Sequence, residues 1–263
     1  KLLVELRYLA SVVNFISLTG RNTSILLPKI VPPQEEIIEI KELKNPILLI
    51  EDEKPVIPNN VNISKTKAVQ IITGPNKNGK SRYMDSIALS QIMFQSGWPI
   101  FATVASMSPK TDLRIHYVQS GVGITGESRF SYECERMHEV FKKARGPYPL
   151  FLIDEPYTAT NHEDATELLQ EILKASAEEN IPLFMTTHYH DLIPYVEELP
   201  NGVNLHCVLG DDGEFTFKIE LGSSTESNAL DVASNSKVRY ADFVEMFTFL
   251  KNSEHLDAKK PAT

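Results

Sequence analysis

The sequence predicts an α/β fold with a mostly parallel central sheet, flanking helices on both of its faces and an N-terminal antiparallel β subdomain. From about residue 68 onward, segments with strand-like and helix-like patterns alternate, which is typical of a sheet covered by helices. Several strand-like segments are continuous apolar runs, as expected for strands buried on both faces. Between residues 30 and 73, short β-rich segments are separated by turn residues, and this pattern predicts an antiparallel meander.

The first segment has the spacing of a helix. Leucines at positions 2, 6 and 9 are followed by Val13 and Ile16, so steps of three and four residues place one apolar stripe on a helix that should end at Gly20. We expect residues 1–29 to hold this helix and a linker. The β-rich stretch that follows should contain strands at residues 37–40, 46–50, 61–64 and 68–72.

Helices and strands should alternate in the rest of the chain. A helix is expected from Lys80 to Gly97. The elements expected after it are strands at 100–104 and 113–118, a helix at 131–144, a strand at 150–153, a helix through 165–173, and strands at 181–186, 204–208 and 215–219. The polar residues 251–263 should form a disordered tail.

Composition limits the classes of function. The net charge is −9, and an acidic chain is a poor candidate for non-specific binding to a phosphate backbone, which needs clustered Lys and Arg. The two cysteines, Cys134 and Cys207, exclude a disulfide scaffold and a four-cysteine zinc site. No apolar run approaches the roughly 20 residues of a membrane span, and the first residues do not read as a signal peptide. We therefore expect a cytoplasmic protein without a membrane partner.

The strongest motif follows the apolar segment at 68–72. It fits the phosphate-binding loop pattern of Gly, four residues and then Gly-Lys-Ser, between a buried strand and a helix. Its residues are Gly74, Pro75, Asn76, Lys77, Asn78, Gly79, Lys80 and Ser81. Backbone amides and the positive helix end would hold polyphosphate oxygens, Lys80 would reach the terminal phosphates, and the Ser81 hydroxyl would bind Mg²⁺. A glycine-containing surface turn is the alternative.

Two further motifs follow later strands. Asp154 and Glu155 come directly after an apolar strand, at the end where open α/β sheets bind ligands. Asp154 suits the Mg²⁺ sphere, directly or through water, and Glu155 would orient or deprotonate an attacking water. His188, at the end of the following strand, would sense or stabilise the terminal phosphate and the water. The alternatives are an acidic turn and a helix-capping or merely exposed histidine.

These motifs resemble those of the MutS-family ATPases. The resemblance includes the phosphate loop with Tyr83-Met84, the pair Asp154-Glu155 and the segment 187–192. The family's signature pattern, Gly-x-Ser-x-Phe-x-x-Glu, is matched by Gly126-Glu127-Ser128-Arg129-Phe130-Ser131-Tyr132-Glu133. Upstream, Pro46 and residues 55–59 are similar to the strands before the loop, and residues 6–11 to the end of the long lever helix. The resemblance extends to about Lys237.

The resemblance implies a P-loop NTPase of the ABC class, with the ATPase domain at residues 30–250 and with ATP and Mg²⁺ as cofactors. It also implies a homodimer, or a heterodimer of paralogues, in which the phosphate loop of one subunit faces the signature segment of the other. Ser128 would then reach the terminal phosphate across the interface, and Val56 and Ile57 would contact the adenine. ATP binding and hydrolysis would drive DNA-binding modules, absent from this chain, in DNA mismatch repair or a related DNA transaction.

Three departures from the family pattern stand out. Arg129 replaces the usual Thr after the signature serine, residues 156–161 replace a Gly-Arg-Gly-Thr-Ser stretch, and Val56 stands where an aromatic side chain is expected to stack on adenine. Base stacking is therefore expected to be weaker. From the residues alone, Ser128 is a helix N-cap, a role that can coexist with phosphate binding.

Two other functions remain open at this point. One is a nucleotide-gated dimerisation module with negligible turnover. The other is a different ABC-class ATPase, such as an SMC-like protein, which a Leu-Ser-Gly-Gly-Gln signature would favour; the sequence has none.

Overall fold

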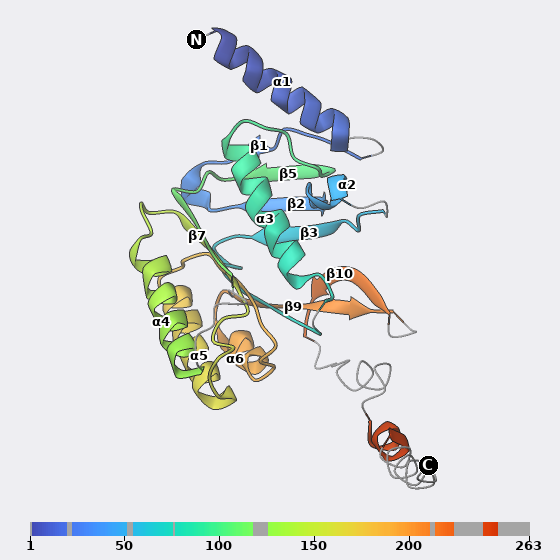
Figure 1. Ribbon diagram of the computed structural model, residues 1–263. Coiled ribbons are helices and arrows are strands. Elements are labelled where there is room, and N and C mark those ends of the chain that lie inside the picture. Colours follow the sequence, from blue (N-terminus) through green and yellow to red (C-terminus); the bar gives the residue numbers. More distant parts are fainter. Residues whose placement is uncertain are drawn as a thin grey trace, which may run out of the picture. The chain divides into compact units, whose positions relative to one another are not determined.

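The computed structural model describes residues 2–19, 23–51, 55–75, 77–117, 126–210, 214–223 and 239–246, with the side chains of 2–6 and 126–128 excepted. The chain divides into two compact units, Lys1–Thr225 and Glu226–Thr263. In the second unit, residues 240–246 are helical, and the Arg239 N–H donates to the Asp242 side chain (2.9 Å). The first unit has the predicted mixed α/β fold (Figure 1).

A 6-stranded sheet forms the centre of this unit, in the order β10-β9-β4-β8-β7-β6. The pairings among β9, β4, β8, β7 and β6 are parallel, and β10 runs antiparallel to β9. The strands are β4 (Val69–Thr73), β6 (Asp112–His116), β7 (Pro149–Asp154), β8 (Leu183–Thr186), β9 (Gly202–Leu209) and β10 (Phe215–Leu221).

A second, 4-stranded sheet has the order β1-β5-β2-β3. Its members are β1 (Lys29–Ile30), β2 (Ile38–Leu43), β3 (Asn59–Ile63) and β5 (Val104–Met107). β2 is antiparallel to both β3 and β5, while β1 is parallel to β5. The predicted N-terminal meander is therefore only partly right, because β5 comes from beyond the phosphate loop and the segment 68–72 forms β4 of the central sheet.

Two predicted strands are wrong. Residues 46–50 do not form a strand but lead into the short helix α2 (Leu48–Glu51), because the Asn45 side chain accepts the N–H of Ile47 (2.9 Å) and turns the chain. The strand predicted at 100–104 begins only at Val104, and Ile100 makes an isolated bridge with Leu26. Its neighbour Phe101 is buried against Phe15 of the first helix, so its apolar character reflects packing rather than strand pairing.

The helices lie close to where periodicity predicts them. They are α1 (Leu2–Thr19), α3 (Lys80–Gln95), α4 (Gly126–Lys142), α5 (His162–Glu178) and α6 (Leu192–Glu198), with a 3-10 turn at Pro33–Glu35. α6 was not expected, and α4 begins five residues earlier than the predicted 131. Among the described residues, no helix combines the length and the apolar character needed to cross a bilayer.

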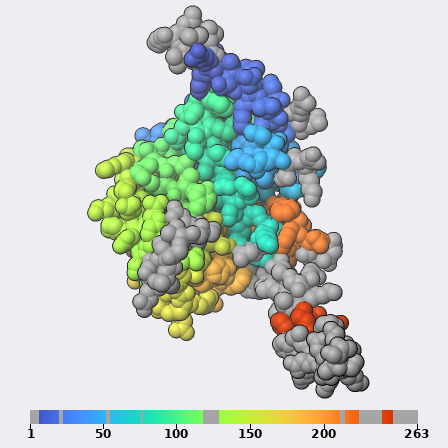
Figure 2. Space-filling view, viewed as in Figure 1, coloured from blue at the N-terminus to red at the C-terminus, as the bar shows by residue number. Residues whose placement is uncertain are grey.

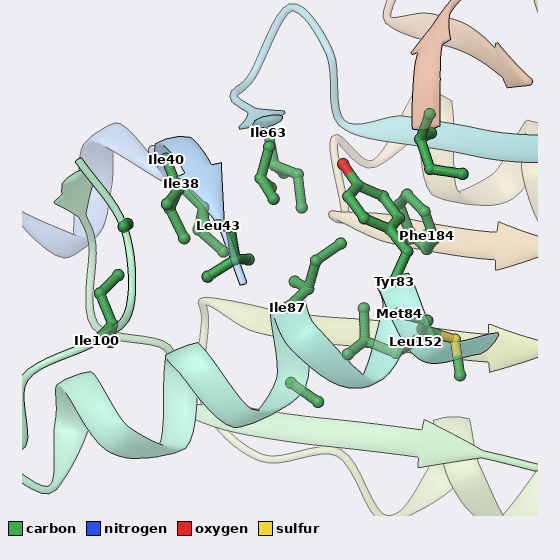
Figure 3. Packing of buried hydrophobic residues seen from close by; sticks show 14 of the residues in the cluster. Ile38, Ile40, Leu43, Ile63, Tyr83, Met84, Ile87, Ile100, Leu152 and Phe184 are labelled. Carbon is green, nitrogen blue, oxygen red and sulfur yellow. The ribbon is translucent and has the colours of Figure 1, made fainter. Parts of the chain in front are cut away.

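Strand alternation explains how both faces of the central sheet are covered. In β7, Leu152 belongs to the cluster on one face and Ile153 to the cluster on the other. The first face packs against α3 and the small sheet; in Figure 3, Met84 and Ile87 of α3 lie between small-sheet residues and Leu152. The second face packs against α4, α5 and α6. The prediction of helices on both faces is confirmed.

Candidate functional site

The predicted site residues converge at one edge of the central sheet. The phosphate loop follows β4, Asp154 ends β7 and Thr186 ends β8. β8 lies between β4 and β7, and Thr186 is in register with both Ile72 and Asp154. Because parallel strands end at the same edge, three segments far apart in sequence meet there.

The loop wraps around the ammonium group of Lys80. Lys80 Nζ donates to the carbonyl oxygens of Gly74 (2.8 Å) and Pro75 (3.1 Å) and lies 3.3 Å from Glu155 Oε1. A Cβ at Gly74, where φ is +141°, would lie 2.9 Å from Cys207 Cβ, so the loop can pass over β9 only with glycine at this position. The loop therefore carries its cation on the side that faces the acidic pair.

The three remaining polar residues of the loop, Asn76, Lys77 and Asn78, differ in burial and in whether the structure describes them. Asn78 is fully buried, and both polar atoms of its amide lack a hydrogen-bond partner among the described residues. Lys77 is exposed and has a left-handed backbone with φ of 68°. Asn76 lies outside the described residues. A buried amide without a partner is costly in a folded protein, and a ligand at the loop would relieve that cost.

Asp154 is tied to the loop through hydroxyl groups. Its Oδ1 accepts hydrogen bonds from Ser81 Oγ (2.9 Å) and Thr186 Oγ1 (2.5 Å). Burial raises the pKa of the Asp154 carboxyl above its ordinary value; these two hydrogen bonds oppose the rise, and the negative charges of Glu155 and Asp85 add to it. A partly desolvated carboxylate beside a hydroxyl offers the hard oxygen donors that Mg²⁺ prefers. The residues predicted to hold the metal therefore fit it.

Glu155 is held in an unusual backbone conformation. Its φ is 42°, in the left-handed region, and its N–H donates to both the carbonyl oxygen (3.1 Å) and the Oγ1 (3.0 Å) of Thr186. Strain of this kind concentrates at functional sites. Thr186 therefore fixes both acidic residues, a role that the motif analysis missed. The available signal was its register opposite Asp154 on the neighbouring strand.

His188 stands at the rim of the same edge. Much of the residue is exposed, and its ring packs on Tyr189 with 4.2 Å between ring centroids. Desolvation of the ring lowers the pKa of His188; the charge of Glu155 raises it and that of Lys80 lowers it further. The charged groups of the acidic pair and of the loop therefore both act on the imidazole of His188.

A cavity of about 740 Å³ opens beside the loop. Lys80, Ser81 and Glu155 line its polar end. Val56 and Ile57, the predicted base-contacting residues, line the same cavity together with Phe215 and Phe217 of β10. Neither phenylalanine was among the predicted site residues.

The signature segment opens α4. Because α4 begins at Gly126, Ser128 lies in its first turn, and the interpretation of Ser128 as an N-cap is wrong. The Ser128 side chain lies outside the described part of the structure. Arg129 contacts both Glu133 (Nε–Oε1, 3.4 Å) and Thr158 Oγ1 (3.2 Å). Two of the departures from the family pattern, Arg129 and the segment 156–161, thus touch each other.

Comparisons with known proteins agree with this geometry. A family model described as MutS domain V matches residues 70–243. The DNA mismatch repair protein MutS of Streptococcus gordonii is 31% identical over 216 residues, which is 79% of this chain and 25% of that protein. The proteins of the same description from Streptococcus equi subsp. equi and Streptococcus mutans are 33% and 34% identical over 181 residues, which is 67% of this chain and 21% of each protein. The chain spans a quarter or less of the length of these relatives.

Proposed function

Because the chain belongs to the MutS family and contains its domain V, a P-loop ATPase domain, we propose that it binds and hydrolyses ATP. ATP binding joins two copies, or this chain and a paralogue, through composite sites to which Ser128 contributes. The cycle drives DNA-handling modules outside this chain, in DNA mismatch repair or a related DNA transaction. Residues 30–250 form the ATPase domain of the ABC class, preceded by the end of a lever helix at 1–29 and followed by a polar tail at 251–263.

One observation carries this proposal. Lys80, Ser81, Asp154 and Glu155 come from two segments more than 70 residues apart, yet the Lys80–Glu155 and Ser81–Asp154 pairs lie within 3.3 Å and 2.9 Å of each other. The positive end of α3 and a cavity large enough for a nucleotide adjoin them. A surface turn with an unrelated acidic pair has no reason to bring these four groups together.

The side chains divide the work as follows. When ATP binds, the ammonium group of Lys80 exchanges its contacts with the loop carbonyls and Glu155 for contacts with the terminal phosphate. This exchange frees the Glu155 carboxylate. Glu155 then takes a proton from a water whose oxygen attacks the terminal phosphorus, as the bond to the bridging oxygen breaks and ADP leaves. Ser81 and Asp154 would hold Mg²⁺, and the ion would neutralise part of the phosphate charge. His188 donates a ring N–H to the terminal phosphate or to the attacking water.

Single-turnover hydrolysis of ATP tests the proposal. Glu155→Gln keeps the size of the side chain but removes the base, so hydrolysis should fall by about 100-fold or more while ATP still binds. Glu167→Gln changes an exposed carboxylate on α5 in the same way and should leave the rate unchanged. If the wild-type chain is no faster than Glu155→Gln, the protein is not an ATPase. If that chain still binds ATP, it is a nucleotide-gated module instead.

A further inference from the structure

The backbone just after the acidic pair is left-handed at two residues. Besides Glu155, Tyr157 has a positive φ of 58°, and its side chain is buried. Such a conformation costs a residue other than glycine about 1–2 kcal/mol, so it persists only where the surrounding structure fixes it. The Glu155 N–H is bonded to Thr186, which fixes the segment on its N-terminal side. The contacts of Tyr157 and Thr158 show what fixes it on the other side.

The start of α4 packs against this segment. The rings of Phe130 and Tyr157 lie 6.0 Å apart between centroids, and Arg129 Nη2 donates to Thr158 Oγ1 (3.2 Å). The Tyr189 hydroxyl donates to the Tyr157 carbonyl oxygen (3.0 Å). In Figure 2 the atoms of α4 (yellow-green) lie next to those of α5 (yellow), the helix into which this segment leads. The backbone after the acidic pair is therefore held by α4 and by the segment that follows β8.

A buried carboxylate orients Arg129. Arg129 Nε lies 3.4 Å from Oε1 of Glu133, one turn farther along α4. The Glu133 side chain is only 8% exposed, and neither of its carboxylate oxygens has a hydrogen-bond partner among the described residues. A buried charge of this kind needs an opposite charge beside it. The guanidinium of Arg129 is thus held between Glu133 and Thr158, although its side chain is 43% exposed.

We propose that Arg129 is a positioning residue for ATP hydrolysis. Through the segment at 157–158, it holds Glu155 in the orientation from which the carboxylate activates water. The inference rests on the proposed function, because Glu155 must first act as the base. Arg129 is not among the described residues that line the cavity beside the loop, so its loss should slow hydrolysis and leave ATP binding unchanged. Both partners of the Arg129–Thr158 bond are departures from the family pattern, so the link is a feature of this chain's own sequence.

Single-turnover hydrolysis at saturating ATP tests this role. Arg129→Met keeps the apolar stem of the side chain and removes the guanidinium. Glu133→Gln is combined with it, so that no buried charge is left without a partner. Arg129→Met/Glu133→Gln should hydrolyse ATP about 10-fold more slowly than Glu133→Gln alone, with the same Kd for ATP, because contacts of this kind orient catalytic groups without touching the ligand. Arg136→Met, a similarly exposed arginine of α4 that pairs with Glu139, is the matched control and should keep the wild-type rate.

A double-mutant cycle identifies the route from Arg129 to the base. Thr158→Val removes the hydroxyl to which Arg129 donates, and Thr158→Ser keeps it. In the Glu133→Gln background, Thr158→Val should slow hydrolysis about as much as Arg129→Met does. Combining the two substitutions should cause little further loss, since both remove the same bond. Thr158→Ser should restore the rate, which a role in packing alone would not require.

The outcomes separate the two proposals. An undiminished hydrolysis rate in Arg129→Met/Glu133→Gln overturns the positioning role and leaves the proposed function intact. A parallel loss of ATP affinity also overturns it, and so do additive losses in the cycle, because Arg129 and Thr158 would then act separately. If Arg129→Met/Glu133→Gln does not fold, equal rates in Thr158→Val and Thr158→Ser overturn the role in the same way. If the wild-type chain does not hydrolyse ATP, the proposed function fails and the positioning role fails with it.

Discussion

The two ends of the nucleotide-sized cavity are built in opposite ways. At the phosphate end, the charged side chains already have hydrogen-bond partners. Lys80 donates to two loop carbonyl oxygens, and Asp154 accepts hydrogen bonds from two hydroxyl groups. At the base end, the lining residues are Val56, Ile57, Phe215 and Phe217, and the Asn59 side chain bonds β10 where its register with β9 shifts. Charge is thus held in place by short polar contacts, while the apolar wall depends on the pairing of distant strands. The following substitutions test this division.

The largest effect is expected at the phosphate end. Lys80→Ala removes the cation around which the loop folds, so binding of both ATP and tripolyphosphate should fall below detection, a loss of more than about 100-fold. Lys174→Ala, on the exposed side of α5, controls for the loss of one positive charge and should bind both ligands normally. Titration calorimetry measures each. Unchanged ATP affinity in Lys80→Ala would contradict the assignment of the phosphate loop.

The second effect separates binding from hydrolysis at the same end. Thr186→Val keeps the shape of the side chain but removes the hydroxyl that bonds Asp154 and the Glu155 N–H. Because such supporting contacts orient metal ligands and catalytic groups, hydrolysis should fall by about 10- to 100-fold with little change in ATP affinity. Thr166→Val, which loses only a bond to a carbonyl in its own helix, is the matched control. Equal hydrolysis rates in the two variants would mean that Thr186 does not position the acidic pair.

The same division explains how far the sequence could predict the molecule. The phosphate end is encoded in contiguous motifs at strand ends, and parallel pairing needs only to bring Gly74, Asp154 and Thr186 to one edge. The base end requires the register shift in β10 and the contact of Asn59 with Phe217, and neither is a local property of the chain. For the same reason, the predicted strands at 46–50 and 100–104 differ from α2 and β5: apolar content alone does not distinguish a paired strand from a short helix or from a buried segment without strand pairing.

A third prediction concerns the stability of the phosphate end without ligand. The pKa of Asp154 is raised in the folded protein, so the native state holds this proton more tightly than the unfolded chain does. The ionised carboxylate therefore destabilises the fold at pH values above its raised pKa, and this cost disappears as the pH falls through that value. Asp154→Asn should melt a few degrees higher than the wild type at pH 7 without Mg²⁺ and nucleotide.

Thermal melts between pH 4 and pH 8 check both the sign and the window of this effect. The difference between Asp154→Asn and the wild type should shrink toward the acidic end, where the wild-type carboxyl is protonated. With ATP and Mg²⁺ added, the order should reverse, because only the wild type gains ligand stabilisation. A variant that melts below the wild type at pH 7 without ligand would show that the charge at Asp154 stabilises the apo fold.

The smallest effect is expected from the residue that fixes the base end. Asn59→Ala removes the hydrogen bonds to the Phe217 carbonyl oxygen and from the Ile219 N–H, where the register of β10 with β9 shifts, but leaves the Phe217 ring itself in place. Each such bond contributes about 0.5–1.5 kcal/mol, so ATP affinity should fall by about two- to tenfold, with the affinity for inorganic tripolyphosphate unchanged. Asn62→Ala, an exposed asparagine on the same strand, should bind both ligands normally. If Asn59→Ala weakens tripolyphosphate binding as much as ATP binding, β10 supports the phosphate loop, where a Cβ at Gly79 would lie 3.3 Å from Phe217 Cδ1, and the two ends of the cavity are not independent.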